Sequence, residues 1–361
     1  MFMKEFLVGG AIRDRILGIA NESTEKDFVV VGSSPEEMSS LGFRQVGKEF
    51  PVFLHPETKD EYALARIERK IGRGYKGFAF DTANSVTLEQ DLSRRDLTIN
   101  AIAQNKDGTG EYIDPFDGIE DLKQKKLRHV SDAFTEDPVR VLRTARFASR
   151  FDYLGFTVDP KTLDLMRKMV TSGEVDALTP ERVFKEISLS MESKSPSVFF
   201  ELLMESGAYQ RLFPMLEVVQ NQNFQMLDVP DLDPEVKFAL WLSNQSSTNI
   251  DLLCEHLKCP KDFQQIAELV STWHQFASEF LKHSPQDVLN FFLKSDGLRR
   301  KKRFEIILTV FDNLGLNTAQ IVQLQVLLNS IKISDLKNLN IAQELLEERL
   351  SVITRFLKSA K

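Results

Sequence analysis

The fold of the N-terminal part of this chain is decided by the stretch TEKDFVVV at residues 24–31. Phe28 to Val31 form an apolar run that Gly32 ends, which predicts a buried strand. If residues 24–27 enter that strand, Glu25 and Asp27 point to the same face, because side chains alternate with a period of two. Two adjacent carboxylates repel each other unless a cation lies between them. Mg²⁺ relieves that repulsion, binds phosphate oxygens and activates an attacking hydroxyl.

The segment before this strand predicts a phosphate-binding turn. Phe6 to Val8 form a short apolar run that ends at Gly9 and Gly10, and residues 11–17 are predicted to form a helix that Gly18 stops. Paired glycines let the backbone approach a ligand closely, and N–H groups at a helix N-terminus attract phosphate. Arg13 adds a guanidinium fork for a triphosphate oxygen. The structural alternatives are a plain tight turn at the glycines and two solvated acids at residues 25 and 27.

A second polar block, RRDLTIN, occupies residues 94–100. Its adjacent arginines favour polyphosphate contacts, and we expect Arg95 to make one. Asp96 and Asn100 carry oxygen and nitrogen atoms that suit a ribose hydroxyl. The structural alternative is a surface helix with charged ends.

The third block, EDPVRVLR at residues 136–143, begins a helix with four arginines on one side. Arg140, Arg143, Arg146 and Arg150 follow one another at intervals of 3, 3 and 4 residues. Apolar residues between them fall on the opposite side. Four like charges in such an array repel one another unless an anion or an acidic partner lies among them.

Asp137 has both a structural and a functional interpretation. An Asp before a Pro is typical of a helix N-cap followed by proline at the first helical position. The functional interpretation pairs the acceptor Asp137 with the donor Arg140. Cytosine and adenine each present a ring-nitrogen acceptor beside an amino donor, whereas uracil and guanine reverse this pattern. A mismatched base would leave buried groups unpaired, at roughly 1–3 kcal/mol each.

Beyond these blocks the chain divides into a mixed and a helical part. Residues 62–65 predict another strand, and residues 66–90, with their charges and glycines, predict a mobile loop. From Pro138 onward helical periodicity dominates, with helices expected at residues 199–204 and 298–308. An α+β head with a small mixed sheet is therefore expected before an all-helical remainder, with the boundary near residues 131–137.

Composition excludes several classes of protein. The 361 residues suit two or three domains, and the net charge of −7 argues against sequence-blind coating of RNA while leaving room for a local basic face. Cys254 and Cys259 are too few for a disulfide framework or a zinc site, so a reducing compartment is expected. We find no signal-length or membrane-spanning apolar run and expect a cytoplasmic protein without a membrane partner.

The order of the three blocks and the acid-x-Asp pair resembles the class II tRNA nucleotidyltransferases, the bacterial CCA-adding enzymes. The resemblance covers residues 5–215 closely. It implies a polymerase-β-like nucleotidyltransferase head at residues 1–137, a helical neck for base recognition at 138–215, and a helical body and tail for tRNA binding at 216–361. It also implies template-independent addition of CCA to the 3′ end of tRNA from CTP and ATP, with release of pyrophosphate.

The resemblance further implies individual residue roles. Glu25 and Asp27 would be catalytic and would hold Mg²⁺, and the nucleotide would be bound by Gly10, Arg13, Arg95, Asp96, Asn100, Asp137, Arg140 and Arg143. Among these, Gly10, Arg13 and Arg95 would bind the triphosphate, Asp96 and Asn100 the ribose, and Asp137 and Arg140 the base. We expect tRNA, CTP and ATP as partners, and neither DNA nor a protein partner.

Two departures from the family pattern bear on function. The first metal position is usually Asp, whereas this chain has Glu25, so Glu61 is the alternative ligand. The chain has five histidines and none is followed by Asp, so we expect a form without the His-Asp phosphohydrolase domain of some relatives, and no phosphatase activity. A restricted relative that adds only CC, only A or poly(A), and a catalytically silent tRNA-binding protein, stay open as alternatives.

Two basic clusters are candidates for RNA contacts. Arg299 to Arg303 form an unbroken run of five cations, which suits a phosphate backbone but equally suits a solvated helix face. Lys123, Lys125, Lys126 and Arg128 form a second cluster nearer the head.

Overall fold

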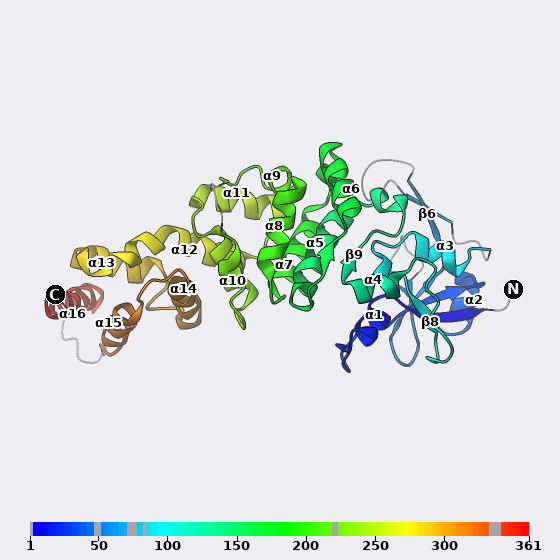
Figure 1. Ribbon diagram of the computed structural model, residues 1–361. Helices are drawn as coiled ribbons and strands as arrows, with labels where there is room; N and C mark the ends of the chain where they lie inside the picture. The colour runs from blue at the N-terminus through cyan, green and yellow to red at the C-terminus, as the bar shows by residue number, and fades with distance from the viewer. Residues whose placement is uncertain are drawn as a thin grey trace. The chain divides into compact units, whose positions relative to one another are not determined.

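The computed structural model of the chain describes residues 3–46, 52–70, 78–81, 85–218, 223–331 and 341–360, with the backbone alone at 68–70 and 78–81. The chain divides into two compact units (Figure 1). Unit 1 comprises residues 1–186 and 198–212, and unit 2 comprises residues 187–197 and 213–361. The three-part division expected from the sequence stays a prediction.

Unit 1 contains a six-stranded mixed sheet. Its strands lie in the order β3 (Arg44–Val46), β4 (Val52–Leu54), β5 (Glu61–Leu64), β2 (Asp27–Val31), β1 (Lys4–Val8) and β8 (Ala103–Asn105). The two central strands, β2 and β5, are parallel, whereas β1 is antiparallel to both of its neighbours.

Strand β2 is buried on both faces, as its apolar run predicts. Val29 and Val31 pack with Phe6 and Val8 in one cluster, and on the opposite face Phe28 stacks on Tyr62 with ring centroids 4.5 Å apart. Only Asp27, at the start of the strand, is exposed. Asp27 therefore lies at the end of a central strand, and the buried residues that follow it fix its position.

Helices surround this sheet and continue unit 1. They are α1 (Gly10–Ile16), α2 (Pro35–Ser40), α3 (Leu88–Ser93), α4 (Gly118–Gln124), α5 (Val139–Phe151), α6 (Pro160–Thr171), α7 (Pro180–Met191), α8 (Pro196–Ser206) and α9 (Ala208–Leu212). Four 3₁₀ helices accompany them in the described part of the unit: η1 (Thr98–Asn100), η2 (Asp132–Glu136), η3 (Asp152–Leu154) and η4 (Glu174–Ala177). The short strands β9 (Lys126–Leu127) and β10 (Thr157–Val158) pair in parallel. Both α7 and α8 contribute residues to each unit.

Unit 2 is helical in the part that the structure describes. Its helices are α10 (Pro234–Leu242), α11 (Ser247–Leu257), α12 (Lys261–Ser278), α13 (Pro285–Lys294), α14 (Lys301–Asn313), α15 (Ala319–Asn329) and α16 (Ile341–Ser359), with η5 (Gln225–Leu227) and η6 (Phe280–Lys282) between them. Aromatic side chains fill its core: the ring centroid of Phe291 lies 5.4, 5.4 and 5.8 Å from those of Trp273, Phe276 and Phe304. Among the helices described, none has the length and apolar content needed to cross a bilayer.

The α+β head followed by a helical remainder is confirmed, but the loop expected at residues 66–90 is partly wrong. Residues 67–70 and 78–81 form the antiparallel strands β6 (Ile67–Lys70) and β7 (Phe78–Asp81), and α3 begins at Leu88. These strands pair with each other rather than with the main sheet. Residues 71–77 and 82–84 lie outside the described chain.

The expected helix at residues 298–308 begins later, at Lys301. Asp296 adopts a left-handed conformation with φ 63°, and residues 295–299 form turns. Arg299 and Arg300 consequently precede the helix, and the basic run is divided between a turn and the first helical residues.

Candidate active site

A cavity of about 520 Å³ in unit 1 brings the three polar blocks together. Its wall contains nine arginines and four acids, so positive charge dominates. The charged residues that line it are Arg13, Asp27, Glu61, Arg66, Arg94, Arg95, Asp96, Asp137, Arg140, Arg143, Arg146, Arg150 and Arg182. An excess of guanidinium groups around one concave space favours a polyanionic ligand.

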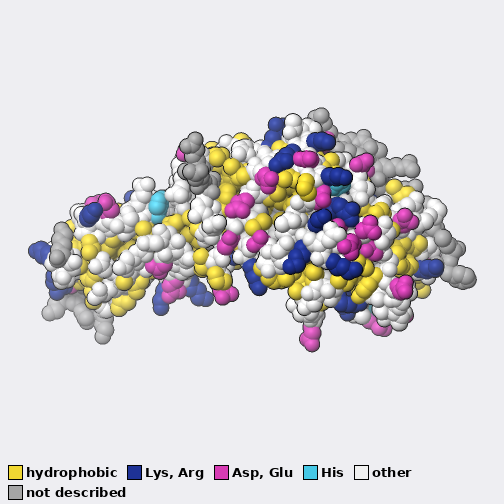
Figure 2. Space-filling model, viewed as in Figure 1, with side chains coloured by type: hydrophobic (Ala, Val, Ile, Leu, Met, Phe, Trp, Pro, Cys, Tyr) yellow, Lys and Arg dark blue, Asp and Glu magenta, His cyan; other side chains and the backbone are white. Residues whose placement is uncertain are grey.

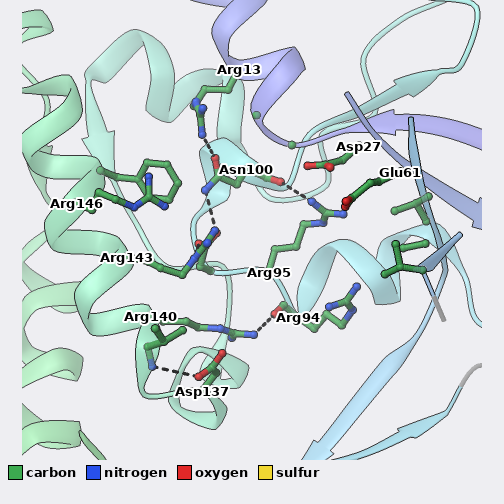
Figure 3. A pocket seen from close by; sticks show the side chains of 18 of the residues that line it. Arg13, Asp27, Glu61, Arg94, Arg95, Asn100, Asp137, Arg140, Arg143 and Arg146 are labelled. Carbon is green, nitrogen blue, oxygen red and sulfur yellow. Dashed lines mark hydrogen bonds and ion pairs between the residues drawn. The ribbon is translucent and has the colours of Figure 1, made fainter. Parts of the chain in front are cut away.

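One end of the cavity is built by strand β2 and the turn between β1 and α1. Asp27 pairs in register with Glu61 of the parallel strand β5 and with Val8 of β1. Gly9 has φ 72°, and a Cβ atom at this position would lie 3.0 Å from Nη1 of Arg95. Figure 3 shows the Arg95 guanidinium directed toward Asp27 and Glu61. The glycine therefore lets a cationic side chain approach the backbone beside a carboxylate.

The environment of Asp27 disfavours its charged form. Asp27 is exposed as a residue, but the wall of the cavity partly removes its carboxylate from water, and this desolvation raises its pKa. Arg95 opposes the shift and the charge of Glu25 adds to it, so the pKa lies above its ordinary value. Glu25 precedes β2 and is absent from the described wall of the large cavity. It lies instead with Asp27 and Glu61 at a smaller cavity of about 250 Å³. The expected metal role of Glu25 stays a prediction.

The residues expected at the ribose form one connected hydrogen-bond network. Nη1 of Arg13 donates to Oδ1 of Asn100, and Nδ2 of Asn100 donates to Asp96 over 2.9 Å. Nε of Arg143 donates to the other oxygen of Asp96 over 2.7 Å. This network joins α1, η1 and α5, as the dashed lines of Figure 3 show in part. It fixes Arg13 and Arg143 on the same cavity wall.

The arginine side of α5 is confirmed, and acidic partners offset its charges. Arg146 pairs with Glu186 at 2.5 Å, and Arg150 pairs with Asp14 at 2.8 Å. Arg143 has Asp96 as its partner. Three of the four stacked arginines thus have a carboxylate partner from another element. These carboxylates offset the repulsion between like charges that the spacing of the arginines would otherwise cause.

Aromatic rings give the same guanidinium groups a second surface. The Cζ atoms of Arg13, Arg143 and Arg146 lie 5.2, 5.5 and 4.4 Å from the ring centroid of Phe147. Contacts of this kind stabilise a cation over the face of an aromatic ring. Phe147 therefore orients three of the arginines that line the cavity.

Asp137 and Arg140 do not contact each other through their side chains in the contacts that the structure gives. Asp137 accepts two hydrogen bonds from Arg182 on α7, at 3.1 and 2.7 Å, and one from the N–H of Val139. Arg140 donates to the carbonyl oxygens of Ala133 and Arg94. Asp137 thus accepts an N–H at the start of α5 as expected, but Pro138 rather than Asp137 occupies the N-cap position. Both side chains line the cavity.

Sequence reasoning left out several residues of this wall. Arg182 and Arg66 line the cavity, and the buried Asp91 contacts both Arg94 and Arg95. Thr87 and Gln90 form a capping box at the start of α3, a Thr-x-x-Gln signal in the sequence that would have placed Asp91 one turn before the two arginines.

The acids present suit a hard divalent ion. Among the described residues no group of three or more His, Cys, Asp or Glu side chains has the arrangement of a complete metal site. Mg²⁺ is usually held by one or two carboxylates, with substrate phosphates and water completing its shell. Asp27, with Glu25 or Glu61 beside it, fits that partial donor set.

The two basic clusters outside the cavity contain ion pairs. Arg303 pairs with Asp296 at 3.0 Å and with Asp262 at 3.4 Å, and Lys301 lies 3.8 Å from Glu305. Figure 2 shows Lys and Arg side chains over the α4, β9 and α6 region of unit 1, with Asp and Glu among them. Binding of RNA by either cluster stays a prediction.

Comparison with known proteins agrees with this architecture. The family model "Poly A polymerase head domain" matches residues 5–128, and "Probable RNA and SrmB- binding site of polymerase A" matches residues 155–219. The CCA-adding enzyme of Coxiella burnetii is 46% identical over 343 residues, covering 93% of this chain and 89% of that protein. The multifunctional CCA protein of Teredinibacter turnerae is 44% identical, with 84% of this chain and 82% of that protein covered.

Solved structures support the fold independently. A CCA-adding enzyme in an apo form superposes with a TM-score of 0.71 at 21% identity, covering 98% of this chain and 88% of that one. The Thermotoga maritima CCA-adding enzyme complexed with tRNA gives 0.68 at 20% identity, with 99% and 92% covered. With this fold and the sequence identity to the curated relatives, the chain belongs to the class II tRNA nucleotidyltransferases, the family of the bacterial CCA-adding enzymes.

Proposed function

We propose that this protein adds CCA to the 3′ end of tRNA from CTP and ATP, without a nucleic-acid template and with release of pyrophosphate. The observation that carries the proposal is the arginine-lined cavity that contains Asp27 and Asp137 in a chain 46% identical to a CCA-adding enzyme. The relatives also include structures described as complexes with tRNA, ATP and CTP.

We assign the reacting end of the nucleotide to the Asp27 end of the cavity. Asp27 and Glu25 would hold Mg²⁺, which supplies charge neutralisation at the α-phosphate and lowers the pKa of the attacking 3′-hydroxyl. Arg95 and Arg13 direct guanidinium groups at the β- and γ-phosphates, and Gly10 leaves space for them beside the backbone. The hydroxyl of the tRNA attacks the α-phosphorus, and the bond to pyrophosphate breaks. Arg95 stabilises the negative charge that pyrophosphate carries away.

The ribose and base lie toward α5 in this assignment. Asp96 and Asn100 would bind the ribose, and Arg143 supports the nucleotide through its bond to Asp96. Asp137 would accept from the amino group of cytosine or adenine, and Arg140 would donate to the ring nitrogen. Arg182 holds the Asp137 carboxylate by two hydrogen bonds, which fixes the orientation of the acceptor. Uracil and guanine would place an acceptor against Asp137 and a donor against Arg140, so the buried groups would stay unpaired.

Because Asp27 and Glu25 are proposed to hold a divalent ion, we propose that the reaction requires one. We expect chelation to abolish incorporation and added Mg²⁺ to restore it. Because two cysteines give no disulfide framework, we place the reaction in the reducing environment of the cytoplasm.

The decisive experiment supplies purified protein with Mg²⁺, labelled CTP or ATP, and three tRNAs that lack CCA, CA or A. Incorporation of C into the first two and A into the third supports the full reaction. Incorporation of one nucleotide alone identifies a restricted relative, and A added repeatedly identifies poly(A) synthesis. Binding of tRNA with no incorporation would reject the enzyme assignment.

Variants of the three acids, tested in the same assay, identify which of them the reaction requires. Asp27→Asn is expected to remove most incorporation with both nucleotides. Glu25→Ala should do the same if Glu25 holds the ion. Activity that survives Glu25→Ala but not Glu61→Gln would transfer the metal role to Glu61, which is the register neighbour of Asp27.

A further inference from the structure

We propose that Asp91 is a positioning residue: it holds Arg95 for triphosphate binding, and it fixes Arg94 to Arg66, the residue that precedes strand β6. The inference rests on the proposed function and adds to it a residue that contacts no substrate. Asp91 itself does not line the described cavity, whereas both arginines do.

Asp91 is buried, and its carboxylate accepts hydrogen bonds from three residues. Its side chain is 0% exposed, and both carboxylate oxygens are engaged. Oδ1 accepts from Nη2 of Arg94 at 2.5 Å, from Nε of Arg94 at 3.0 Å and from the backbone N–H of Arg66 at 3.3 Å. Oδ2 accepts from Nη2 of Arg95 at 3.3 Å. On α3 and the residues after it, the spacings i+3 and i+4 bring both arginines over the same acid.

The two adjacent arginines therefore have different roles. Arg94 donates from Nε to the carbonyl oxygen of Arg66 as well as to Asp91, and its own carbonyl accepts from Arg140. These bonds join α3 to the residue that precedes β6 and to the arginine expected to read the base. Arg94 acts as an anchor for the cavity wall.

Arg95 is held far more weakly. Its contacts with Asp91 and with the carbonyl oxygen of Asn100 are long, 3.3 and 3.4 Å, and its buried Nε atom has no hydrogen-bond partner. Such a guanidinium has donors left for an anion. Asp91 is the only carboxylate among its described hydrogen-bond and ion-pair partners. The orientation of Arg95 is therefore set by this charged contact together with the bond to the Asn100 carbonyl.

The charge of Asp91 is maintained by the same arginines. Burial alone would raise the pKa of Asp91, but Arg94 and Arg95 lower it by more, so the carboxylate is ionised at neutral pH. Loss of that charge has two opposing effects. It makes the cavity more positive, which favours phosphate, and it releases Arg95, which disfavours phosphate. A buried donor in a fixed position contributes more than a uniform change in potential, so we expect the loss of position to dominate.

The test uses Asp91→Asn in the full chain, with inorganic pyrophosphate as the probe. We expect pyrophosphate affinity, measured by titration calorimetry, to fall about tenfold or more, the size expected for one lost charge-assisted hydrogen bond. The KM for CTP should rise by a similar factor, with tRNA affinity unchanged. A merely structural role would instead lower kcat and the unfolding temperature without a selective loss of pyrophosphate binding.

A double-mutant cycle separates positioning from general disruption. Because Asp91 is proposed to act through Arg95, Asp91→Asn should weaken pyrophosphate binding little further in an Arg95→Ala background. Additive losses would overturn the proposal. Asp176→Asn is the control, since it removes a carboxylate bound to Arg211 on the surface of the same unit and should leave pyrophosphate affinity unchanged.

Asp91→Glu keeps the charge and serves as the second variant if Asp91→Asn does not fold. It displaces the carboxylate by one methylene, so pyrophosphate affinity should fall by several-fold. Because the site is fully buried, the added methylene is also expected to lower the unfolding temperature. Wild-type pyrophosphate affinity in either folded variant overturns the inference. Absence of nucleotide incorporation by the wild-type protein would instead reject the proposed function, so the two failures are distinguishable.

Discussion

At the scale of single residues, Asp137 combines an observed structural role with the base contact that we propose for it. It accepts the N–H of Val139 at the start of α5 and two bonds from Arg182. An ionised carboxylate has about four acceptor sites, so these three bonds leave room for one base amino group. Three fixed donors also prevent rotation of the acceptor. If Asp137 and Arg140 read the base as proposed, selection of C and A should therefore depend on Arg182 as well.

Removal of Arg182 tests this dependence. We expect Arg182→Ala to raise the KM for CTP and ATP about tenfold and to increase misincorporation of UTP, because Asp137 loses its bidentate support. Incorporation of all four nucleotides, measured separately, checks the prediction. Arg211→Ala is the control, since Arg211 makes the same bidentate contact with Asp176 on the exposed surface. Equal discrimination in both variants would show that Arg182 only stabilises the helix.

The carboxylate of Asp96 is expected to make the unfolding free energy depend on pH. Burial raises the pKa of Asp96, but Arg143 and Asn100 lower it by more, so its folded pKa lies below the ordinary value of about 3.9. A depressed folded pKa contributes stability that is present above the unfolded pKa and is lost as pH falls below it. Asp96→Asn should therefore lower the unfolding free energy by about 1–3 kcal/mol at pH 7. Unfolding monitored from pH 7 to pH 3 should show a smaller loss for the variant than for the wild type.

Residue roles could be predicted from the sequence only within a local motif. The spacing of Arg140, Arg143, Arg146 and Arg150 requires acidic partners, but it cannot name Asp14, Glu186 or Asp96, which come from distant elements. Arg182 lies 45 positions after Asp137, and a lone arginine at the start of a helix carries no signal for that pairing. Long-range ion pairs depend on packing, which is not encoded in any one window of sequence.

At the scale of elements, the close packing of α4 on η1 positions Asn100, one of the two residues proposed to bind the ribose. A Cβ atom on Gly118 would lie 2.3 Å from the carbonyl oxygen of Thr98, so only glycine allows this approach. Thr98 begins η1, which ends at Asn100. Any displacement of η1 would move Asn100 and, through it, Arg13 and Asp96.

Gly118→Ala is expected to destabilise unit 1 by more than about 2 kcal/mol, the cost of overpacking together with a backbone shift. Nucleotide KM should rise because Asn100 moves. Gly18→Ala is the control: Gly18 has φ 71°, but a Cβ atom there would meet no other atom within 4 Å, so its cost is backbone strain of about 1–2 kcal/mol. Thermal unfolding and CTP kinetics of the two variants check both effects. A smaller destabilisation at Gly118 than at Gly18 would contradict the packing argument.

Elements with strong periodicity were predictable, and those with mixed patterns were not. The unbroken apolar run of β2 predicts a strand buried on both faces, and the arginine spacing of α5 specifies one face of a helix, so both elements form where expected. Strands β6 and β7 pair only with each other in the described chain. The charges and glycines of residues 66–90 predicted a loop there, because neither strand shows the alternating or unbroken apolar pattern that predicts a strand.

At the scale of the whole molecule, an acidic protein must bind two polyanions. The net charge is −7, yet nine arginines line one cavity of unit 1. Concentrating positive charge in a concave site allows local attraction without general binding of nucleic acid. Contacts with the tRNA backbone then require further cations outside the cavity, and the run at 299–303 in unit 2 is one candidate.

The residues of the run at 299–303 differ in whether they form ion pairs. Arg303 is engaged by Asp296 and Asp262 and supports the fold, whereas Arg299 and Lys302 are exposed and form no ion pair within the described chain. Reversal of the latter two, as Arg299→Glu with Lys302→Glu, is expected to weaken tRNA binding about tenfold. It should reduce the slope of log affinity against log salt by about 1–2, since each lost phosphate contact contributes roughly 0.7–0.9.

The control for this double reversal is Lys282→Glu with Lys358→Glu, which changes the net charge equally on other exposed positions of unit 2. Affinities measured by filter binding over a range of salt concentrations separate the two pairs. If both pairs weaken tRNA binding to the same extent, the effect is one of net charge. If neither does, the run at 299–303 is a solvated surface, and tRNA must be held by other cations, of which the cluster at 123–128 is the next to reverse. A loss confined to the first pair, with an unchanged KM for CTP, would assign phosphate contacts to this face, because the cavity proposed to bind the nucleotide is lined by residues of unit 1.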